Sequence, residues 1–258
     1  MQPLKQLCMK AIIIIASILV VAIGNQCARK QAKTFYEDSD QVKTSYEQTK
    51  KDGELVKDGE FKKFYKSGKV HKVEHYNEGV QEGKYKRYDK NGNIREITDY
   101  VNDSIHGKRK LFYPDSSIRI IETYRKGQYH GPYKAYFKNG QLKVEGQYHH
   151  NKMDSLWTYY YEDGTVKEKV TFANNTETGP FTSYYKNGQL QAKGEYVDEM
   201  EKGIWHYYYK TGELKEVVDY LDKPGWKNCK VKKYDKEGNL TKIVVFENYR
   251  KKEVKEVD

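Results

Sequence analysis

The chain has 258 residues, of which 33% are charged, 37% are hydrophobic and 25 are tyrosine. Aromatic residues make up 14% of the chain, which argues against a disordered protein, because disordered chains lack aromatic side chains. The formal net charge is +10, but acidic residues are interleaved with the lysines throughout. Without a stripe of one sign, this charge argues against a nucleic-acid partner.

The first predicted element is an N-terminal signal helix within residues 1–27. Residues Ala11 to Gly24 form an apolar run of 14 residues, which is short for a membrane span and typical of a signal-peptide core. Cys27 stands where a bacterial lipoprotein carries its lipid, so lipidation of Cys27 is one alternative. Cleavage after Gly24 and a retained membrane anchor are the others. All three place the rest of the chain in the cell envelope, outside the cytoplasm, as a lipid-anchored, periplasmic or secreted protein.

The segments on either side of the central array lack its pattern. Residues 28–52 are polar and show no apolar period, so they are predicted to be a tether, with at most a short helix. Residues 247–258 are predicted to be a charged tail. The array itself is predicted to occupy residues 53–246.

Asn-Gly and related pairs recur at a fixed spacing in the array. From Gly68 to Gly212 the turn glycines are 24 residues or a multiple of 24 apart, with Ser116 at the one missing place, and a step of 26 leads to Gly238. Self-similarity at a fixed period indicates a repeat protein, here with eight repeats. Position 0 of each repeat, nine residues before the turn residue, falls on Gly59, Gly83, Gly107, Gly131, Ser155, Gly179, Gly203 and Cys229.

Three positions carry one kind of side chain in every repeat. Positions 5 and 17 are aromatic, as in Tyr136 and Tyr148, and position 11 is aliphatic, as in Leu142. With Tyr, Val, Ile and Thr around an Asn-Gly pair, the repeat is predicted to be a β-hairpin with a two-residue type I′ turn. The whole array is then an all-β fold, an elongated and twisted antiparallel sheet of tandem 24-residue hairpins.

The two-residue turn predicts which positions pair. Position 2 should lie opposite 15, position 5 opposite 12 and position 6 opposite 11, so positions 2, 4, 6, 11, 13, 15 and 17 should share a buried face. Position 12 is often Lys or Arg, which predicts a cation over the ring at position 5. Apolar residues at position 14 in some repeats, such as Val73 and Ile97, do not fit a clean division into two faces.

The segments "GPYKAYFKNGQLKVEGQY" and "GPFTSYYKNGQLQAKGEY" resemble the MORN-variant repeat, which is found in many bacterial proteins. The resemblance covers residues 59–246 and departs from the pattern at Ser116, Ser155 and Cys229, where glycine is replaced. It implies no catalytic residues and no cofactor. Arrays of this kind are often labelled YwqK family antitoxins, a role that fits poorly with export, because an antitoxin of that kind works beside its toxin in the cytoplasm.

No motif for chemistry is present: there is no phosphate-binding glycine loop, serine nucleophile elbow or HExxH sequence. The histidines are interpreted as solvated loop residues and no metal site is predicted, although His106 and His130 share one repeat position and His149–His150 lies in a loop between repeats. The sequence therefore predicts that the chain is not an enzyme.

The predicted function is an exported, non-enzymatic binding or scaffold module of the bacterial cell envelope, with a protein or an envelope glycan as partner. The alternative is an antitoxin-like neutraliser of a partner protein. Because Trp and Tyr dominate binding hot spots, the excess of aromatic residues in repeats four to seven is predicted to form a partner-binding strip. Its members are Trp157, Tyr159, Tyr161, Tyr185, Trp205, Tyr207 and Tyr209. Plain packing of these rings is the competing interpretation.

Overall fold

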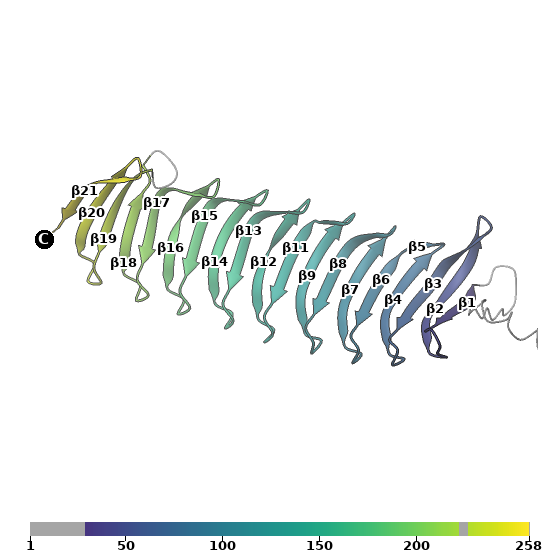
Figure 1. Cartoon of the computed structure of the whole chain (residues 1–258). Helices are drawn as coiled ribbons and strands as arrows, with labels where there is room; N and C mark the ends of the chain where they lie inside the picture. The colour runs from purple at the N-terminus through teal and green to yellow at the C-terminus, as the bar shows by residue number, and fades with distance from the viewer. Residues whose placement is uncertain (1–28, 222–226, 258) are drawn as a thin grey trace, which may run out of the picture. The chain divides into compact units, whose positions relative to one another are not determined.

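The computed structural model describes residues 29–221 and 227–257, which form 21 β-strands and no helix (Figure 1). The predicted signal helix and Cys27 lie outside these residues. Among the described residues, none belongs to a helix that could cross a membrane. The all-β fold of tandem antiparallel hairpins is thus confirmed, and every pairing recorded between strands is antiparallel.

The strands divide into two compact parts, which are described separately. The first part contains the described residues up to Gly107 together with Pro114–Ser116. Its strands are β1 (Lys30–Phe35), β2 (Val42–Lys51), β3 (Glu54–Phe64), β4 (Val70–Asn77), β5 (Val80–Gln81), β6 (Gly83–Tyr88) and β7 (Ile94–Val101). Strand β8 (Ser104–Phe112) begins in this part and ends in the second.

The second part contains Lys108–Tyr113 and the described residues from Ser117 onward. Its strands after β8 are β9 (Ile118–Arg125), β10 (Gln128–Tyr129), β11 (Gly131–Tyr136), β12 (Leu142–His149), β13 (Lys152–Tyr160), β14 (Val166–Ala173), β15 (Thr176–Tyr184), β16 (Leu190–Val197), β17 (Met200–Tyr208), β18 (Leu214–Asp219), β19 (Asn228–Tyr234), β20 (Leu240–Glu247) and β21 (Arg250–Glu256). Within each part the strands lie side by side in one layer (Figure 1).

Both segments that flank the predicted array contain strands: the prediction of a tether over residues 28–52 was wrong, and the predicted charged tail, residues 247–258, contains β21. Residues 30–35 and 42–51 form β1 and β2, and β2 pairs with β3 over Thr44–Lys51. At the other end β21 pairs with β20, and all seven of its residues are exposed. The edge strand of a sheet presents unpaired backbone N–H and C=O groups. The adjoining segments of the same chain form hydrogen bonds with these groups although their sequences lack the repeat pattern.

The Asn-Gly pairs do not form type I′ turns, which corrects the predicted loop. In the loop after β11, the backbone N–H of Gly140 donates to the carbonyl of Phe137 at 3.0 Å, and that of Phe137 donates to the carbonyl of Gln141 at 2.8 Å. Only Gly140 has a positive φ, 86°. This is a type I turn closed by a left-handed glycine, a three-residue loop that ends in a bulge.

Two-residue type I′ turns occur instead at the opposite end of the strands, between repeats. His150 and Asn151 have φ of 48° and 65° and separate the paired residues His149 and Lys152. The same pair of positive φ values occurs at Asn102–Asp103, Asn174–Asn175, Asp198–Glu199 and Asn248–Tyr249. Asn and Asp tolerate this conformation better than most residues. The chain therefore alternates two turn types, one at each end of the strands.

The bulge changes the register at the three-residue loop. Position 2 lies opposite 15 as predicted, with Tyr133 paired to Gly146, but position 5 pairs with position 11, Tyr136 with Leu142. The extra residue at position 12 is left outside the ladder. The aliphatic position 11 therefore shares a face with position 5 and not with position 2. The predicted cation–π pairs shift likewise: Lys143 and Lys215, both at position 12, lie over the position-6 rings of Phe137 and Tyr209.

The core lies on one face of each part. We call positions 2, 4, 13, 15 and 17 the packed face and positions 3, 5, 11 and 14 the second face. Most buried apolar side chains belong to the packed face: among them are Phe61, Tyr124, Ala135, Trp157, Val170, Phe172, Ala192, Trp205, Val218 and Tyr220. Burial of each indole contributes roughly 4–6 kcal/mol of transfer free energy. A single layer of strands is thus stabilised chiefly by side chains of neighbouring strands packing along one face.

Candidate binding surface

The packed face of the first part is polar at its centre. The Glu74 carboxylate is 6% exposed and accepts hydrogen bonds from Lys72 Nζ at 2.7 Å and from the Tyr76 hydroxyl at 3.3 Å. Lys57 Nζ lies 4.4 Å from the ring centres of both Phe61 and Tyr76. Burial lowers the pKa of Lys57 and, together with the nearby Glu74, raises the pKa of Tyr76 to about 12. These charges satisfy one another, as buried ions must.

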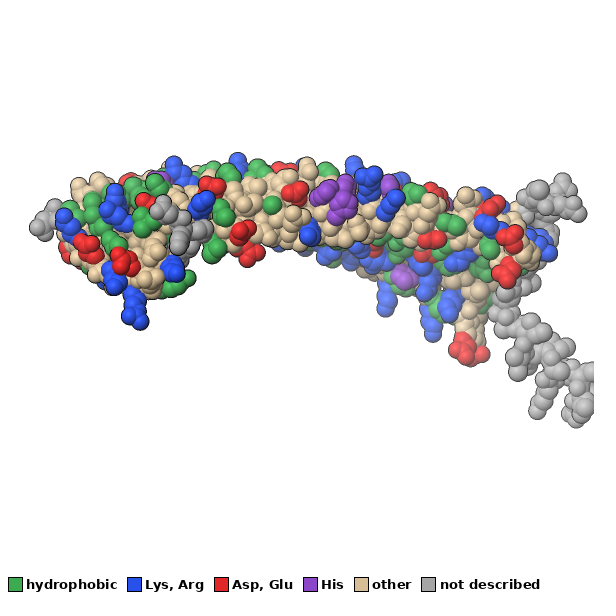
Figure 2. Space-filling view, turned by 90° about the horizontal axis from the view of Figure 1, so that it is seen from above, with side chains coloured by type: hydrophobic (Ala, Val, Ile, Leu, Met, Phe, Trp, Pro, Cys, Tyr) green, Lys and Arg blue, Asp and Glu red, His purple; other side chains and the backbone are tan. Residues whose placement is uncertain are grey.

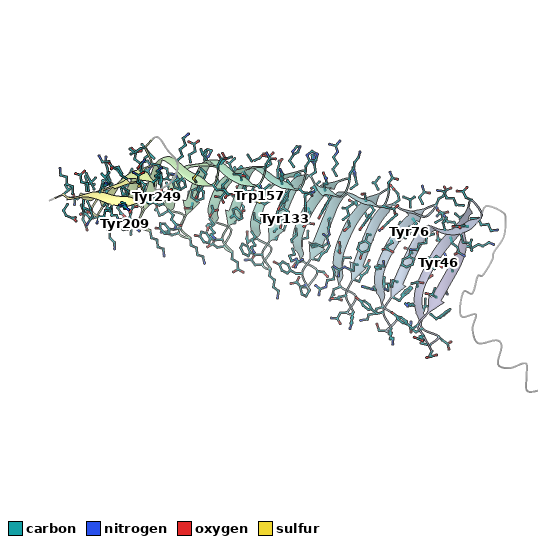
Figure 3. The ribbon with its side chains drawn as sticks, turned by 45° about the horizontal axis from the view of Figure 1, so that its top comes forward. Tyr46, Tyr76, Tyr133, Trp157, Tyr209 and Tyr249 are labelled. Atoms are coloured by element: carbon teal, nitrogen blue, oxygen red, sulfur yellow. The ribbon has the colours of Figure 1, made fainter. Side chains whose placement is uncertain are left out.

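In the second part the same face is built from aromatic rings. Trp157 packs against Tyr133, Tyr148 and Phe172, with ring centres 5.1–6.3 Å apart. Tyr133 on β11 and Trp157 on β13, both labelled in Figure 3, are separated by β12. Trp205 packs against Phe181, Tyr196 and Tyr207 in the same way. Trp157 is 2% exposed and Trp205 is 1% exposed. The prediction that these two residues anchor a partner was wrong, because buried indoles offer it no surface.

Three other members of the predicted strip link one repeat to the next. The hydroxyl groups of Tyr161, Tyr185 and Tyr209, all at position 6, donate to the backbone carbonyls of Tyr184, Tyr208 and Tyr234 at 2.8–2.9 Å. Tyr65 and Tyr113 make the same bond to Tyr88 and Tyr136. The recurrence of Tyr at position 6 was visible in the sequence, but the bulge that aims it at the next repeat was not.

The last two predicted strip residues, Tyr159 and Tyr207, are half-buried on the packed face at position 4. The Tyr207 hydroxyl donates to Glu201 Oε1 at 2.8 Å, and the Tyr220 hydroxyl donates to the other oxygen of the same carboxylate. Burial and this carboxylate raise the pKa of both phenols. Burial also raises the pKa of Tyr159. Tyr207 is therefore held by the Glu201 carboxylate, whereas Tyr159 is a partly exposed side chain.

A groove that sequence reasoning missed runs along the second face of the first part, over β3, β4 and β6. Val73 is 8% exposed and pairs with Lys62 on one side and Lys86 on the other. The groove has a volume of about 680 Å³ and is lined by Glu60, Lys62, Gly68, Lys69, Val70, Val73, His75, Lys86, Tyr88, Asn91 and Gly92. Three lysines against one carboxylate make it basic. The signal was the apolar position 14 beside a Lys at position 3.

The repeated hairpin geometry agrees with a family comparison. The model of the MORN repeat variant matches residues 57–78, 81–102, 129–150, 153–174 and 177–198. The chain carries MORN-variant repeats. Each of the five matches begins two residues before position 0 of a repeat. The family model and the hairpin register therefore define the same unit. Residues 103–128, between the second and third matches, contain a repeat of the same length with Ser116 at the turn, where its φ is 68°.

Other comparisons add little to the MORN-variant assignment. No curated protein matches the chain. Among solved structures it is similar to segments of the crystal structures of TcdB2-TccC3 and TcdB2-TccC3-Cdc42, at 11% identity and a TM-score of 0.23 in both cases. The similarity covers 84% of this chain and 14% and 13% of those chains, so the chain spans about one seventh of their length.

Proposed function

We propose that this MORN-variant protein is a non-enzymatic binding or scaffold module of the bacterial cell envelope, whose partner is a protein or an envelope glycan. Arrays of repeats provide extended binding surfaces. The observation that carries the proposal is the groove on the second face of the first part, where Val70, Val73 and Tyr88 form an apolar floor beside three lysines. This combination suits an acidic ligand with an apolar portion.

The surface also fits a binding role better than a catalytic one. The groove-lining residues include one carboxylate, Glu60, which is paired with Lys62, and one imidazole, His75, whose Nδ1 lies 2.9 Å from the carbonyl of Lys84. Retention of a ligand is the function that these residues support.

Export is the second element of the proposal and rests on the sequence of residues 1–27. A charged start, a short apolar run and Cys27 support a lipoprotein signal, with cleavage after Gly24 as the alternative. Fatty-acid labelling of the wild type and of Cys27→Ala tests this element. Label on the wild type alone supports a lipid anchor, and absence of label from both chains leaves plain secretion.

The binding element is tested by a pull-down from envelope extracts with the wild type and with Lys69→Glu/Lys86→Glu. Reversal of two charges at the groove should abolish retention of an acidic partner, whereas Lys50→Glu, an exposed lysine of β2, should retain it. Digestion of the extract with protease or glycosidase separates a protein partner from a glycan. Equal retention of the partner by the wild type, the double variant and Lys50→Glu would rule out the groove as the binding site. Recovery of a small toxin in the pull-down would favour the antitoxin-like alternative.

A further inference from the structure

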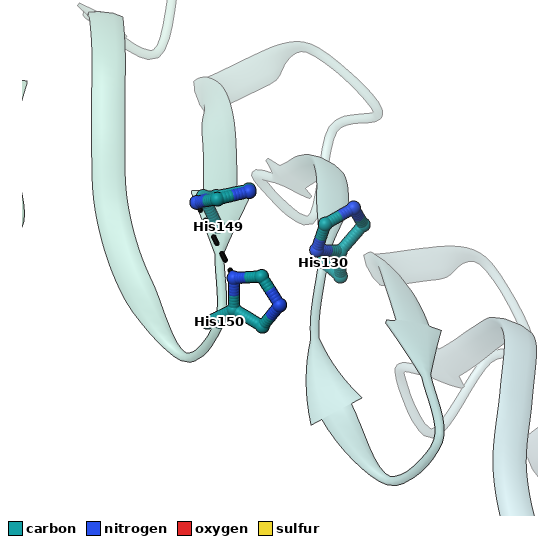
Figure 4. A group of neighbouring side chains, drawn as sticks. All are labelled: His130, His149 and His150. Carbon is teal, nitrogen blue, oxygen red and sulfur yellow. Dashed lines mark hydrogen bonds between the residues drawn. The ribbon is translucent and has the colours of Figure 1, made fainter.

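Three histidines from two adjacent strand ends meet on the second part of the chain. His130 precedes β11, His149 ends β12 and His150 opens the type I′ turn that follows. Each offers a ring nitrogen within 4.8 Å of those of the other two, and the Nδ1 atoms of His149 and His150 are 3.4 Å apart (Figure 4). Figure 2 shows a purple histidine patch on the surface, with blue Lys and Arg side chains beside it.

Backbone geometry brings these side chains together. Consecutive residues of a strand point to opposite faces, so His149 and His150 would diverge if the strand continued. The left-handed φ of His150, 48°, turns its ring back toward His149. The turn is fixed to the neighbouring repeat, because Asn151 donates its backbone N–H to the carbonyl of Tyr129 at 3.0 Å and accepts the N–H of Tyr129 on its side chain at 2.7 Å. His150 is thereby held 5.2 Å from His130, between ring centres.

We propose that His130, His149 and His150 bind one divalent transition-metal ion of the class preferred by imidazole, Zn²⁺, Cu²⁺ or Ni²⁺. A tetrahedral ion with Zn–N bonds of 2.0–2.1 Å holds its ligand atoms about 3.4 Å apart, which is the spacing of the two Nδ1 atoms already. The third nitrogen, on His130, lies within 4.8 Å of the other two, and we expect it to move closer to them when the ion binds. Three imidazoles leave one position of the ion open to water or to an anion.

The surroundings favour a borderline ion such as Zn²⁺ on neutral imidazole ligands. A hollow of about 300 Å³ beside the trio is lined by His130, His150, Arg125, Lys126 and Gln128. None of these residues is a carboxylate, which disfavours Ca²⁺ and Mg²⁺. Nδ1 of His130 is buried without a hydrogen-bond partner, an arrangement that a metal ion would satisfy. The two cations reduce the affinity for any free cation, but they also favour an anion at the open position.

Repeat-equivalent positions show that the trio is specific to this place in the chain. His106 stands one repeat before His130, but Arg125 and Lys126 stand one repeat before His149 and His150. One repeat later the two positions hold Ala173 and Asn174. His106 thus offers a matched control, a histidine at the same repeat position without the two partners from the next turn.

Calorimetric titration of the full, untagged chain with ZnCl2, CuSO4 and NiCl2 tests the proposal. We expect one ion per chain for at least one metal, with a dissociation constant below about 100 μM, and a loss of at least tenfold in His149→Ala and in His150→Ala. His106→Ala should bind like the wild type. The Cu²⁺ complex should show nitrogen hyperfine coupling in its electron paramagnetic resonance spectrum, which weakens in each variant of the trio.

Two results would overturn the proposal. One is wild-type binding that misses the expectation: a dissociation constant above about 1 mM for all three metals, or one between about 100 μM and 1 mM that does not rise tenfold in the variants of the trio. The other is undiminished binding by the triple variant His130→Ala/His149→Ala/His150→Ala, which would place the ion elsewhere. Circular dichroism of each variant checks the fold, and the single variants of the exposed His149 and His150 keep the test decisive if replacement of His130 disturbs it.

Discussion

Trp157 lies so close to Gly146 of the preceding repeat that a Cβ atom on the glycine would be 2.2 Å from Cδ2 of the indole. The same relationship recurs 48 residues later, where a Cβ on Gly194 would be 2.2 Å from Cδ2 of Trp205. Glycine at position 15 thus provides the space into which the tryptophan of the next strand fits. The side chain at position 15 of one repeat therefore limits the size of the side chain that fits at position 2 of the next repeat.

Substitution of Gly146 by alanine should therefore destabilise the second part. The added methyl group forces the Trp157 ring away from its buried site, and overpacking of this kind typically costs about 1–3 kcal/mol. Urea unfolding followed by tryptophan fluorescence measures the loss. Gln147→Ala, at the exposed neighbouring position, should change the free energy of unfolding by less than about 0.5 kcal/mol. Equal stability of Gly146→Ala and the wild type would show that the indole does not need this space.

Removal of the Tyr185 hydroxyl in Tyr185→Phe should lower the free energy of unfolding by about 1 kcal/mol, because the bond to the Tyr208 carbonyl is lost. Phe137 provides the reciprocal experiment, since it occupies position 6 without a hydroxyl. Phe137→Tyr should be as stable as the wild type or more stable by up to about 1 kcal/mol. If Tyr185→Phe lost a partner in the pull-down without loss of stability, Tyr185 would belong to a binding site after all.

Acid should weaken the first part of the chain through Asp58 on β3. Its carboxylate accepts hydrogen bonds from Arg29 Nε at 2.9 Å and from the backbone N–H of Glu78 at 3.3 Å, and the bond from Arg29 is the main cause of its lowered pKa. A pKa lowered on folding stabilises the fold above the unfolded value of about 3.9. That contribution is lost as the pH falls through the folded pKa.

Asp58→Asn should consequently be less stable than the wild type at pH 6, and this difference should shrink toward pH 2. Urea midpoints at the two pH values measure it, with Glu54→Gln, at an exposed strand end, as the control. Salt should reduce the effect because Arg29 is 53% exposed. A difference of the same size at both pH values would contradict the role of the Asp58 charge.

Deletion of one whole repeat, Gly131–Asp154, should leave a folded protein with two fewer strands. The 24-residue deletion joins His130 to Ser155. Ser155 holds the same repeat position as Gly131, and both residues have a positive φ, 62° at Ser155 and 109° at Gly131. Deletion of Gly131–Leu142, half a repeat, joins incompatible turns and removes one strand of an antiparallel pair. Thermal melting should show a cooperative transition for the first variant and its loss for the second. Similar melting of both would mean that the hairpin is not the structural unit.

The period, the hairpin and the packed position 2 could be predicted from sequence because they depend on local chemistry that recurs. The turn type could not be predicted, since Asn139–Gly140 suits both a two-residue I′ turn and a type I turn with a left-handed glycine. The choice moves the register by one residue, and with it Leu142 from one face to the other.

The candidate surfaces were less predictable because they depend on neighbours in space. Tryptophans such as Trp157 and Trp205 are typical of binding hot spots. Gly146 and Gly194 leave room for the two indoles to pack against the sheet, where they are buried. The groove beside Val73 arises from lysines of two strands that flank it. The histidine trio depends on the left-handed φ of His150 and on the place of His130 at the neighbouring strand end, so its members meet only once the register between the strands is known.

Strands β1 and β21 carry several lysines, a composition that disfavours pairing of an edge strand with another chain. Strand β21 has the sequence RKKEVKE, is exposed throughout and pairs with β20 on one side, while β1 carries Lys30 and Lys33. A sheet of equivalent hairpins could in principle add further chains strand by strand, as amyloid does. Positive charge on both terminal strands would oppose positive charge in any such junction. Because salt screens this repulsion, we expect association of copies through these strands to increase with ionic strength.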